Sequence, residues 1–336
     1  MSVILFYILN SLVNALVATI LGFVIYFRNR KQLVNKIFAL FCAVVAIWSY
    51  AYFAWFLLKD KNIVLFNHRI FLMGASIFIA ILFFHSILAL TDKIKQYKKF
   101  LVWGYIIFSF FLIIDWFTPF IVKDVQKEMF FEFWPKAGIL LTPYLIVWYF
   151  YFLLSGYIMV KEIKRMSSSN LQTDISYRAQ LKYIFVGAII GLAGSTPNYF
   201  LWYDIMIPPV SNFLVAIGMI VVAYGIVKHH MFNIKLLMSE LLVFTIWIFV
   251  IARTALSNNT QDLLINGTLM LLVFIAGILL MRSASKEVEV ERKLLKETQK
   301  DLDLEQRLRK TFAEIAEEQT KKIEKIVSDK KYNNIK

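Results

Sequence analysis

The stretch MSVILFYILNSLVNALVATILGFVIYF (Met1–Phe27) decides the fold class, because it contains no Lys, Arg, Asp or Glu. About 20 apolar residues cross a bilayer, since about 30 Å of hydrocarbon is spanned at about 1.5 Å per helical residue. No basic segment precedes the apolar run, as it would in a cleavable signal peptide. The stretch therefore predicts a retained first transmembrane helix.

Apolar segments of this length recur along the whole chain. Hydrophobic residues make up 59% of the 336 residues and charged residues only 18%, whereas soluble domains are about half apolar and a quarter charged. We expect an all-α, polytopic membrane helix bundle, with seven spans in residues 1–230 and a connector plus two more in 231–282. The nine predicted spans are 3–27, 37–58, 70–90, 100–118, 139–160, 183–203, 208–227, 236–252 and 263–281.

The positive charges predict the orientation. The net charge is +14, and most Lys and Arg residues lie in alternate short loops, as in membrane proteins with positive cytoplasmic loops. Nine spans then place the N-terminus outside the cell and the C-terminus in the cytoplasm. The chain is expected in the cell membrane with the lipid bilayer as its partner, and without nucleic acid. Cys42 is the single cysteine, so neither an internal disulfide nor a thiolate metal site is expected.

The composition changes at Arg282. Residues 283–336 contain no Pro or Gly and are rich in helix-forming residues, which predicts a long cytoplasmic helix. Heptad position a is mostly apolar and position d mostly polar, so the helix is expected to form a weak, coiled-coil-like seam. The residues expected to contribute to this seam are Val288, Leu295, Leu302, Phe312, Ile323 and Ile326.

Few polar groups interrupt the predicted spans. His85, next to Ser86, is titratable at membrane depth, which makes it a candidate functional group; the alternative is a neutral histidine hydrogen-bonded between helices. Pro197 should kink its span, and Ser195, Thr196 and Asn198 can bond the backbone groups that it frees.

A ligand pocket, if present, is expected between the outer ends of the fourth, sixth and seventh spans, because such pockets combine apolar walls with a few polar groups. For Asp115 the alternative is a solvated carboxylate at the interface, and for the tryptophans it is an aromatic belt. The candidate lining residues are Asp115, Trp116, Asn198, Tyr199, Trp202 and Asn212.

Three segments together resemble the N-terminal seven-helix region of bacterial sensor histidine kinases. They are NKIFALFCAVVAIWSYAYFAWF (Asn35–Phe56), RIFLMGASIFIAILFFHSILALT (Arg69–Thr91) and PPVSNFLVAIGMIVVAYGIVKHHMFNIK (Pro208–Lys235). The resemblance covers about residues 30–310. It implies a sensor region that leads into a signalling helix, and it implies a homodimer, because kinases of this family act as dimers.

The resemblance also implies a phosphoacceptor box, approximately F-x-x-x-A-S-H-E-x-R-T-P. Phe312 and Ala316 fit this box, but Glu318 stands at the histidine position. Because the sequence ends at Lys336, before an ATP-binding domain, we expect no enzyme activity from this chain and no cofactor.

Three functions are consistent with these patterns. The first is a sensory module that relays a stimulus through its cytoplasmic helix to a separate kinase or response protein. The second is a transporter or permease, since broken helices and buried polar groups also occur in transporters. The third is a degenerate receptor that acts as a membrane scaffold.

Overall fold

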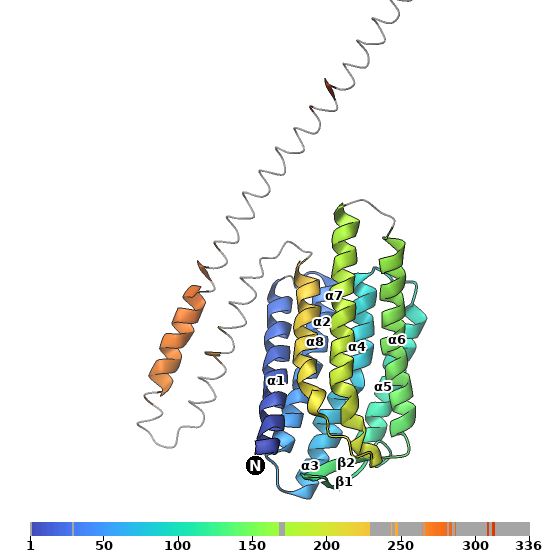
Figure 1. Ribbon diagram of the computed structural model, residues 1–336, viewed down its shortest axis with the longest axis vertical. Helices are drawn as coiled ribbons and strands as arrows, with labels where there is room; N and C mark the ends of the chain where they lie inside the picture. The colour runs from blue at the N-terminus through green and yellow to red at the C-terminus, as the bar shows by residue number, and fades with distance from the viewer. Residues whose placement is uncertain are drawn as a thin grey trace, which may run out of the picture. The chain divides into compact units, whose positions relative to one another are not determined.

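The computed structural model describes residues 2–28, 30–167 and 172–228, together with 243, 246–247, 264, 266–280, 282–283, 286, 308 and 311–312. Its main body is a bundle of antiparallel helices (Figure 1). The helical elements are α1 (Ser2–Arg28), α2 (Leu33–Trp55), α3 (Lys61–Asn67), the π-helical segment η1 (His68–Met73), α4 (Gly74–Leu90), α5 (Lys98–Phe117), α6 (Leu141–Arg165), α7 (Gln172–Ser195) and α8 (Leu214–Lys228).

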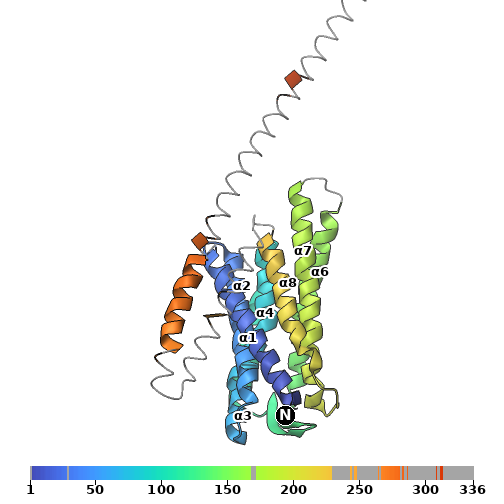
Figure 2. The ribbon, with the colours of Figure 1, turned by 60° about the vertical axis from the view of Figure 1, so that its left-hand side comes forward.

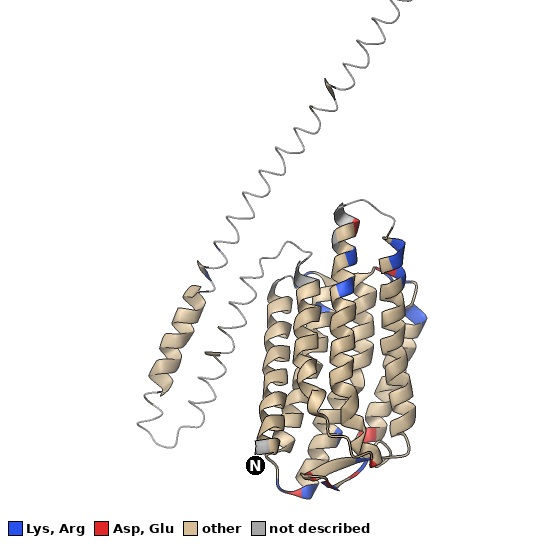
Figure 3. Cartoon of the chain, in the orientation of Figure 1, with Lys and Arg blue, Asp and Glu red and all other residues tan. Residues whose placement is uncertain are grey.

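The helices run up and down through the bundle, so that their connections gather at two ends. One end carries a β-hairpin between α5 and α6 and is called the hairpin end. The other end carries the loops after α1, α4 and α6 and is called the basic end, because Lys and Arg gather there (Figure 3). α4 packs against α2, α5 and α6, while α8 packs against α1 and α7 (Figures 1 and 2).

The membrane-spanning character of the chain is confirmed. Among the described residues, six helices are long and apolar enough to cross a membrane, and Val210–Gly225 forms a shorter apolar helix at the seventh predicted position. The eighth predicted span, 236–252, lies almost entirely outside the described residues. The ninth is represented by the apolar helix Asn266–Leu280. The total of nine spans therefore stays a prediction.

The predicted start of the third span at residue 70 is wrong, because the helix begins at Lys61 and runs to Leu90. Asp60 caps its N-terminus, where Oδ1 accepts hydrogen bonds from two backbone N–H groups at 2.9 and 3.0 Å. The polar residues near its start are used inside the fold. The Asn67 amide donates to the Ala51 carbonyl at 2.8 Å, and the Arg69 guanidinium donates to the Val122 carbonyl at 2.9 Å.

The prediction of an all-α fold is wrong at one place. β1 (Val122–Glu128) and β2 (Phe131–Ala137) form a two-stranded antiparallel sheet. The turn between them places Met129 in the left-handed region, with φ of 52°. An isolated hairpin is marginally stable in water, but this one packs the side chains of Phe131 and Trp134 into the bundle, where they are buried. Trp55 also ties it to α2, since its Nε1 donates to the Phe133 carbonyl at 2.8 Å.

The predicted signalling helix cannot be compared with the structure over most of its length. Val288, Leu295, Leu302, Ile323 and Ile326 lie outside the described residues. Phe312 is described as helical and 67% exposed. The coiled-coil seam and the domain boundaries at 230 and 282 stay predictions.

Candidate functional site

A cavity of about 90 Å³ lies inside the bundle. α2, α4 and α6 form one side, α7 and α8 form the other, and η1 and β2 border it at the hairpin end. Its lining runs along α2 from Phe41 to Trp55, a separation of about 21 Å at about 1.5 Å per residue. The cavity is therefore long and narrow.

The walls are apolar and aromatic. Five tryptophans line the cavity, and among its described lining residues none is Lys, Arg, Asp or Glu. A charged ligand group would thus be buried without a partner of opposite charge, which is costly. The tryptophans in the lining are Trp48, Trp55, Trp134, Trp148 and Trp202.

Glycines form the α7–α8 side of the cavity. A Cβ atom added to Gly218 would lie 2.6 Å from the Gly191 backbone nitrogen and 2.7 Å from the Gly187 carbonyl oxygen. The two helices therefore touch backbone to backbone, as small residues allow in membrane helix pairs. A Cβ atom added to Gly191 would meet nothing within 4 Å, so the cavity has free space at this position.

The predicted break at Pro197 is confirmed. α7 ends at Ser195 and continues as the 3₁₀ segments η2 (Thr196–Tyr199) and η3 (Leu201–Tyr203). Pro197 has no N–H to give to the Ala193 carbonyl four residues earlier, and the Ser211 hydroxyl donates to that carbonyl instead, at 3.3 Å.

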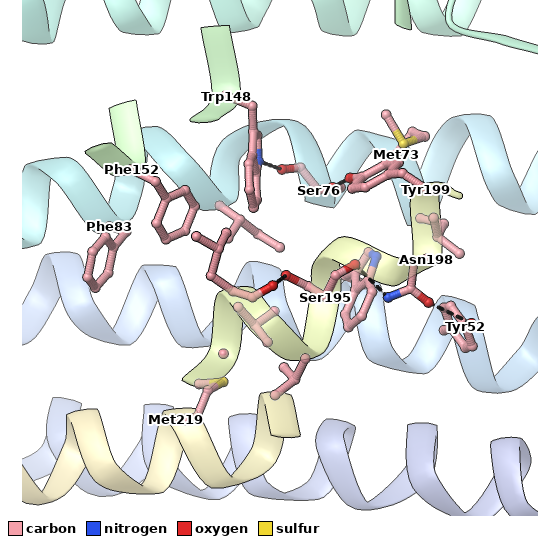
Figure 4. A pocket seen from close by; sticks show the side chains of 18 of the residues that line it. Tyr52, Met73, Ser76, Phe83, Trp148, Phe152, Ser195, Asn198, Tyr199 and Met219 are labelled. Atoms are coloured by element: carbon pink, nitrogen blue, oxygen red, sulfur yellow. Dashed lines mark hydrogen bonds between the residues drawn. The ribbon is translucent and has the colours of Figure 1, made fainter. Parts of the chain in front are cut away.

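Asn198 joins the broken end of α7 to two other parts of the bundle, α2 and the segment before α8. Its Oδ1 accepts from the Tyr52 hydroxyl of α2 at 2.9 Å, and its Nδ2 donates to the Ser195 carbonyl at 2.9 Å (Figure 4). Nδ2 also lies 3.4 Å from Oδ1 of Asn212, in η4 (Val210–Phe213) before α8. Asn14 of α1 completes the network, because its Nδ2 donates to the Asn212 carbonyl at 3.1 Å.

Ser76 of α4 is the centre of a second group of hydrogen bonds in the cavity wall. Its hydroxyl lies 3.3 Å from the Tyr199 hydroxyl and 3.4 Å from the Tyr144 hydroxyl. Its backbone carbonyl accepts from Nε1 of Trp148 at 3.1 Å (Figure 4). Most polar groups of the cavity are therefore bonded to one another.

Two buried polar atoms of the lining have no hydrogen-bond partner among the described residues, namely Nε2 of His68 and Nε1 of Trp134. Both residues are fully buried. Nδ1 of His68 lies 2.9 Å from the Val64 carbonyl, which can only accept, so Nδ1 carries the proton. In the neutral ring Nε2 is then an acceptor, whereas Nε1 of Trp134 is a donor. Two side chains that line the hairpin end of the cavity thus carry one unused acceptor and one unused donor.

The residues predicted to line a pocket divide into two groups. Asn198, Tyr199 and Trp202 line the cavity, and Asn212 lies behind them as a partner of Asn198. Asp115 and Trp116, on the last turn of α5, do not line it. Asp115 is fully buried, so a solvated interfacial carboxylate is also the wrong description of it.

The intramembrane pair His85 and Ser86 also lies away from the cavity. Nδ1 of His85 is 2.9 Å from the hydroxyl of Tyr105 on α5. The hydroxyl of Ser86 donates to the Leu82 carbonyl at 2.8 Å. His85 of α4 therefore forms a hydrogen bond to the neighbouring helix α5. This agrees with the alternative interpretation of His85, a histidine that is hydrogen-bonded between helices.

Sequence reasoning missed several lining residues, above all Tyr52, His68, Ser76 and Trp134. Each lies in an apolar or loop segment without a local motif, and the fold alone brings them together. One usable signal is the spacing of Gly187 and Gly191, four residues apart, which is typical of close helix packing in membranes.

A buried ion pair fixes the hairpin beside the cavity. Nζ of Lys136 lies 3.0 Å from Oε1 of Glu128 and also contacts Oδ1 of Asp204, in the loop after η3. The side chain of Glu128 is only 5% exposed. Burial raises the pKa of Glu128, but hydrogen bonds from Gln126 and Lys136 outweigh burial and hold the pKa below its usual range.

We expect Lys136→Met to lower the free energy of unfolding by about 2 kcal/mol at pH 7, because it leaves the Glu128 carboxylate buried without its cation. In the native chain Glu128 stabilises the fold above its ordinary pKa of about 4.3, and this is lost as the pH falls through the lower folded-state pKa. In the variant burial dominates, so acidification toward pH 5 should restore part of the lost stability. Thermal unfolding followed by tryptophan fluorescence measures both effects. Lys127→Met, at an exposed position, is the control; equal loss in both variants would contradict the role of the pair.

The six span-length helices and the apolar cavity among them define the class of a polytopic helical membrane protein. Residues 11–235 match the model of the N-terminal 7TM region of histidine kinases, and the chain belongs to this family. The resemblance seen in the sequence is therefore confirmed as far as residue 235. This region of histidine kinases is non-catalytic, and the matched residues 11–235 do not include a kinase domain. No curated protein and no solved structure matches it.

Proposed function

We propose that this protein is a sensory module of the cell membrane in which the cavity is the sensing site. The carrying observation is the position of the cavity between two groups of helices, α2, α4 and α6 on one side and α7 and α8 on the other. A molecule that fills this space changes how the two groups pack. The family match, to a region that belongs to receptors, supports the same function.

The charges support an orientation with the hairpin end outside the cell. Within residues 2–228, the basic end carries fourteen Lys and Arg against three Asp and Glu, while the hairpin end carries six of each kind. Positive loops stay in the cytoplasm. The cavity then lies toward the outer half of the membrane, and the N-terminus is outside.

The glycine contact between α7 and α8 supports a relay. Because backbone touches backbone at Gly218, these two helices move as one body. α8 ends at Lys228, and the chain continues toward the two further predicted spans and the cytoplasmic helix. We propose that a molecule bound in the cavity shifts α7 and α8 between two packing arrangements, as a two-state switch requires. The weak homodimeric seam predicted in the tail would change its helix pairing in response to this shift.

A steric plug tests the relay without any ligand. Gly191→Phe places a ring in the free space of the cavity. In a Cys42→Ala background, single cysteines at Leu295 or Leu302 report homodimer cross-links in native membranes. We expect the plug to change the ratio of the two cross-link yields by about fivefold, which corresponds to a coupling of about 1 kcal/mol.

Leu153→Phe is the control for added bulk, because Leu153 is 70% exposed on the outer face of α6. It should leave the cross-link ratio unchanged. An unchanged ratio with the plug as well would overturn the proposed relay. The proposed partner, a separate kinase or response protein, is tested by mass spectrometry of what co-purifies with the tagged chain from native membranes; recovery of this chain alone would count against such a partner.

A further inference from the structure

We infer that the cavity binds an amphiphile with one medium-length apolar chain and a small, uncharged head that both donates and accepts hydrogen bonds. The chain would lie between α2 and the α7–α8 pair, and the head would lie at the hairpin end beside His68 and Trp134. This inference deepens the proposed function, on which its signalling role rests, by naming the chemical class that the cavity recognises.

The shape of the cavity limits the length and width of the apolar chain that can bind. A volume of about 90 Å³ gives room for about six to nine water-sized groups. The lining extends over about 21 Å of α2, so these groups must lie in a row. A single chain of about six to eight carbon atoms with one small polar group fits such a space, whereas a fused ring system or a two-chain lipid does not. Phe41, Phe83 and Val222 line the apolar part of the cavity.

The two polar atoms without a partner determine which polar head group the ligand needs. Nε2 of His68 and Nε1 of Trp134 are both buried and both lack a partner in the part of the chain that the structure describes, and a buried polar group without a partner costs free energy. A hydroxyl group satisfies both kinds of need, because it can donate to Nε2 and accept from Nε1. An amide has the same capacity.

The other polar groups of the cavity limit the size of the head. Tyr52 donates to Asn198, and Trp148 donates to the Ser76 carbonyl, so these donors are already used within the fold. Their bonds tie helices together (Figure 4). A large or charged head would have to break these bonds or bury a charge among aromatic rings. The structure therefore favours a small neutral head.

The protein's own fluorescence provides the test. Five of its eight tryptophans line the cavity, so a brominated chain inside the cavity would quench much of the emission. The probe is a primary alcohol whose seven-carbon chain carries bromine at its far end, titrated into the full chain in phosphatidylcholine nanodiscs. We expect saturable quenching above the linear background from probe in the bilayer.

The plug variant separates cavity binding from partition into lipid. Gly191→Phe should remove the saturable component and leave the linear one. Gly267→Phe is the matched control, because a Cβ atom there also meets nothing within 4 Å and the position does not line the cavity. It should bind like the native chain. Linear quenching alone in the native chain would overturn the inference.

Changing the probe tests the head without changing the protein. The same brominated chain with no polar head should bind about tenfold more weakly, because both hydrogen bonds are lost. The chain with a carboxylate or a trimethylammonium head should also lose about tenfold or more, because the charge is buried unpaired. Equal affinity of the charged and neutral probes would overturn the assignment of a neutral head.

Two sources could supply this chemistry, the bilayer itself or the outside medium. Mass spectrometry of lipid extracted from protein purified from native membranes separates them. A single-chain neutral amphiphile that co-purifies with the native chain and not with Gly191→Phe supports the bilayer as source. A chain that purifies empty and then titrates to saturation supports the medium as source.

Different experimental results would contradict the inferred ligand class and the proposed sensory function. The cross-linking experiment needs no ligand, so a tail that responds to the plug keeps the sensory function even if no amphiphile binds. Saturable binding with a tail that does not respond to the plug would keep the ligand class and overturn the relay.

Discussion

Replacement of Gly218 by leucine should reduce the free energy of unfolding by about 3 kcal/mol or more and sharply lower the yield of folded protein. The added Cβ would lie 2.6–2.8 Å from backbone atoms of Gly191 and Gly187. Backbone atoms cannot turn aside as a flexible side chain can, so α7 and α8 must separate. Overpacking in a close-packed interior costs about 1–3 kcal/mol where neighbours can adjust, and here they cannot. Thermal unfolding and size-exclusion chromatography in detergent measure the effect.

The control for this result is the same substitution on the other helix of the pair. Gly191→Leu adds its side chain to free space, and replacement of a glycine within a helix gains up to about 1 kcal/mol from helix propensity. We expect its unfolding temperature to equal or exceed that of the native chain. If Gly191→Leu and Gly218→Leu lost the same stability, the close backbone contact would not be the cause.

The six long apolar helices found among the described residues were predictable, because a bilayer demands such helices and they are visible as runs of apolar residues. The third span shows the limit. Asn67 and Arg69 look like loop residues, yet their partners are the Ala51 and Val122 carbonyls, on α2 and the hairpin. Such distant partners cannot be read from local composition. The hairpin was missed for the same reason, since its stability comes from docking on the bundle.

The site was predictable only where a local signal marked it. Pro197 must break a helix, and the neighbouring polar residues Asn198 and Tyr199, which were predicted to line a ligand pocket, line the cavity. That they bind a ligand stays a prediction. His68 and Trp134 carry no such signal, because neither lies in a predicted span: His68 precedes the third one, and Trp134 lies between the fourth and the fifth. Asp115 attracted attention by its charge alone, but the structure buries it outside the cavity.

Trp134 should be the most sensitive side chain of the hairpin, with a loss of about 3–5 kcal/mol in the free energy of unfolding on replacement by alanine. The residue is fully buried. Its ring centroid lies 4.7 Å from that of Trp55 and 4.5 Å from that of Phe131, so its removal leaves a void where the hairpin meets α2. Thermal unfolding measures the loss. Trp103→Ala is the control, since Trp103 is 61% exposed on α5 and should change stability by less than about 0.5 kcal/mol.

Trp134→Phe separates packing from ligand recognition at the same position. Nε1 of Trp134 has no hydrogen-bond partner among the residues that the structure describes, so the phenylalanine variant keeps most of the ring contacts and loses no hydrogen bond to them. We expect it to retain at least half of the stability that alanine loses, because most of the apolar volume remains. Its affinity for the hydroxyl-bearing probe should fall, and its affinity for the headless chain should not. A variant that weakened both probes equally would show that Trp134 acts through the shape of the cavity alone.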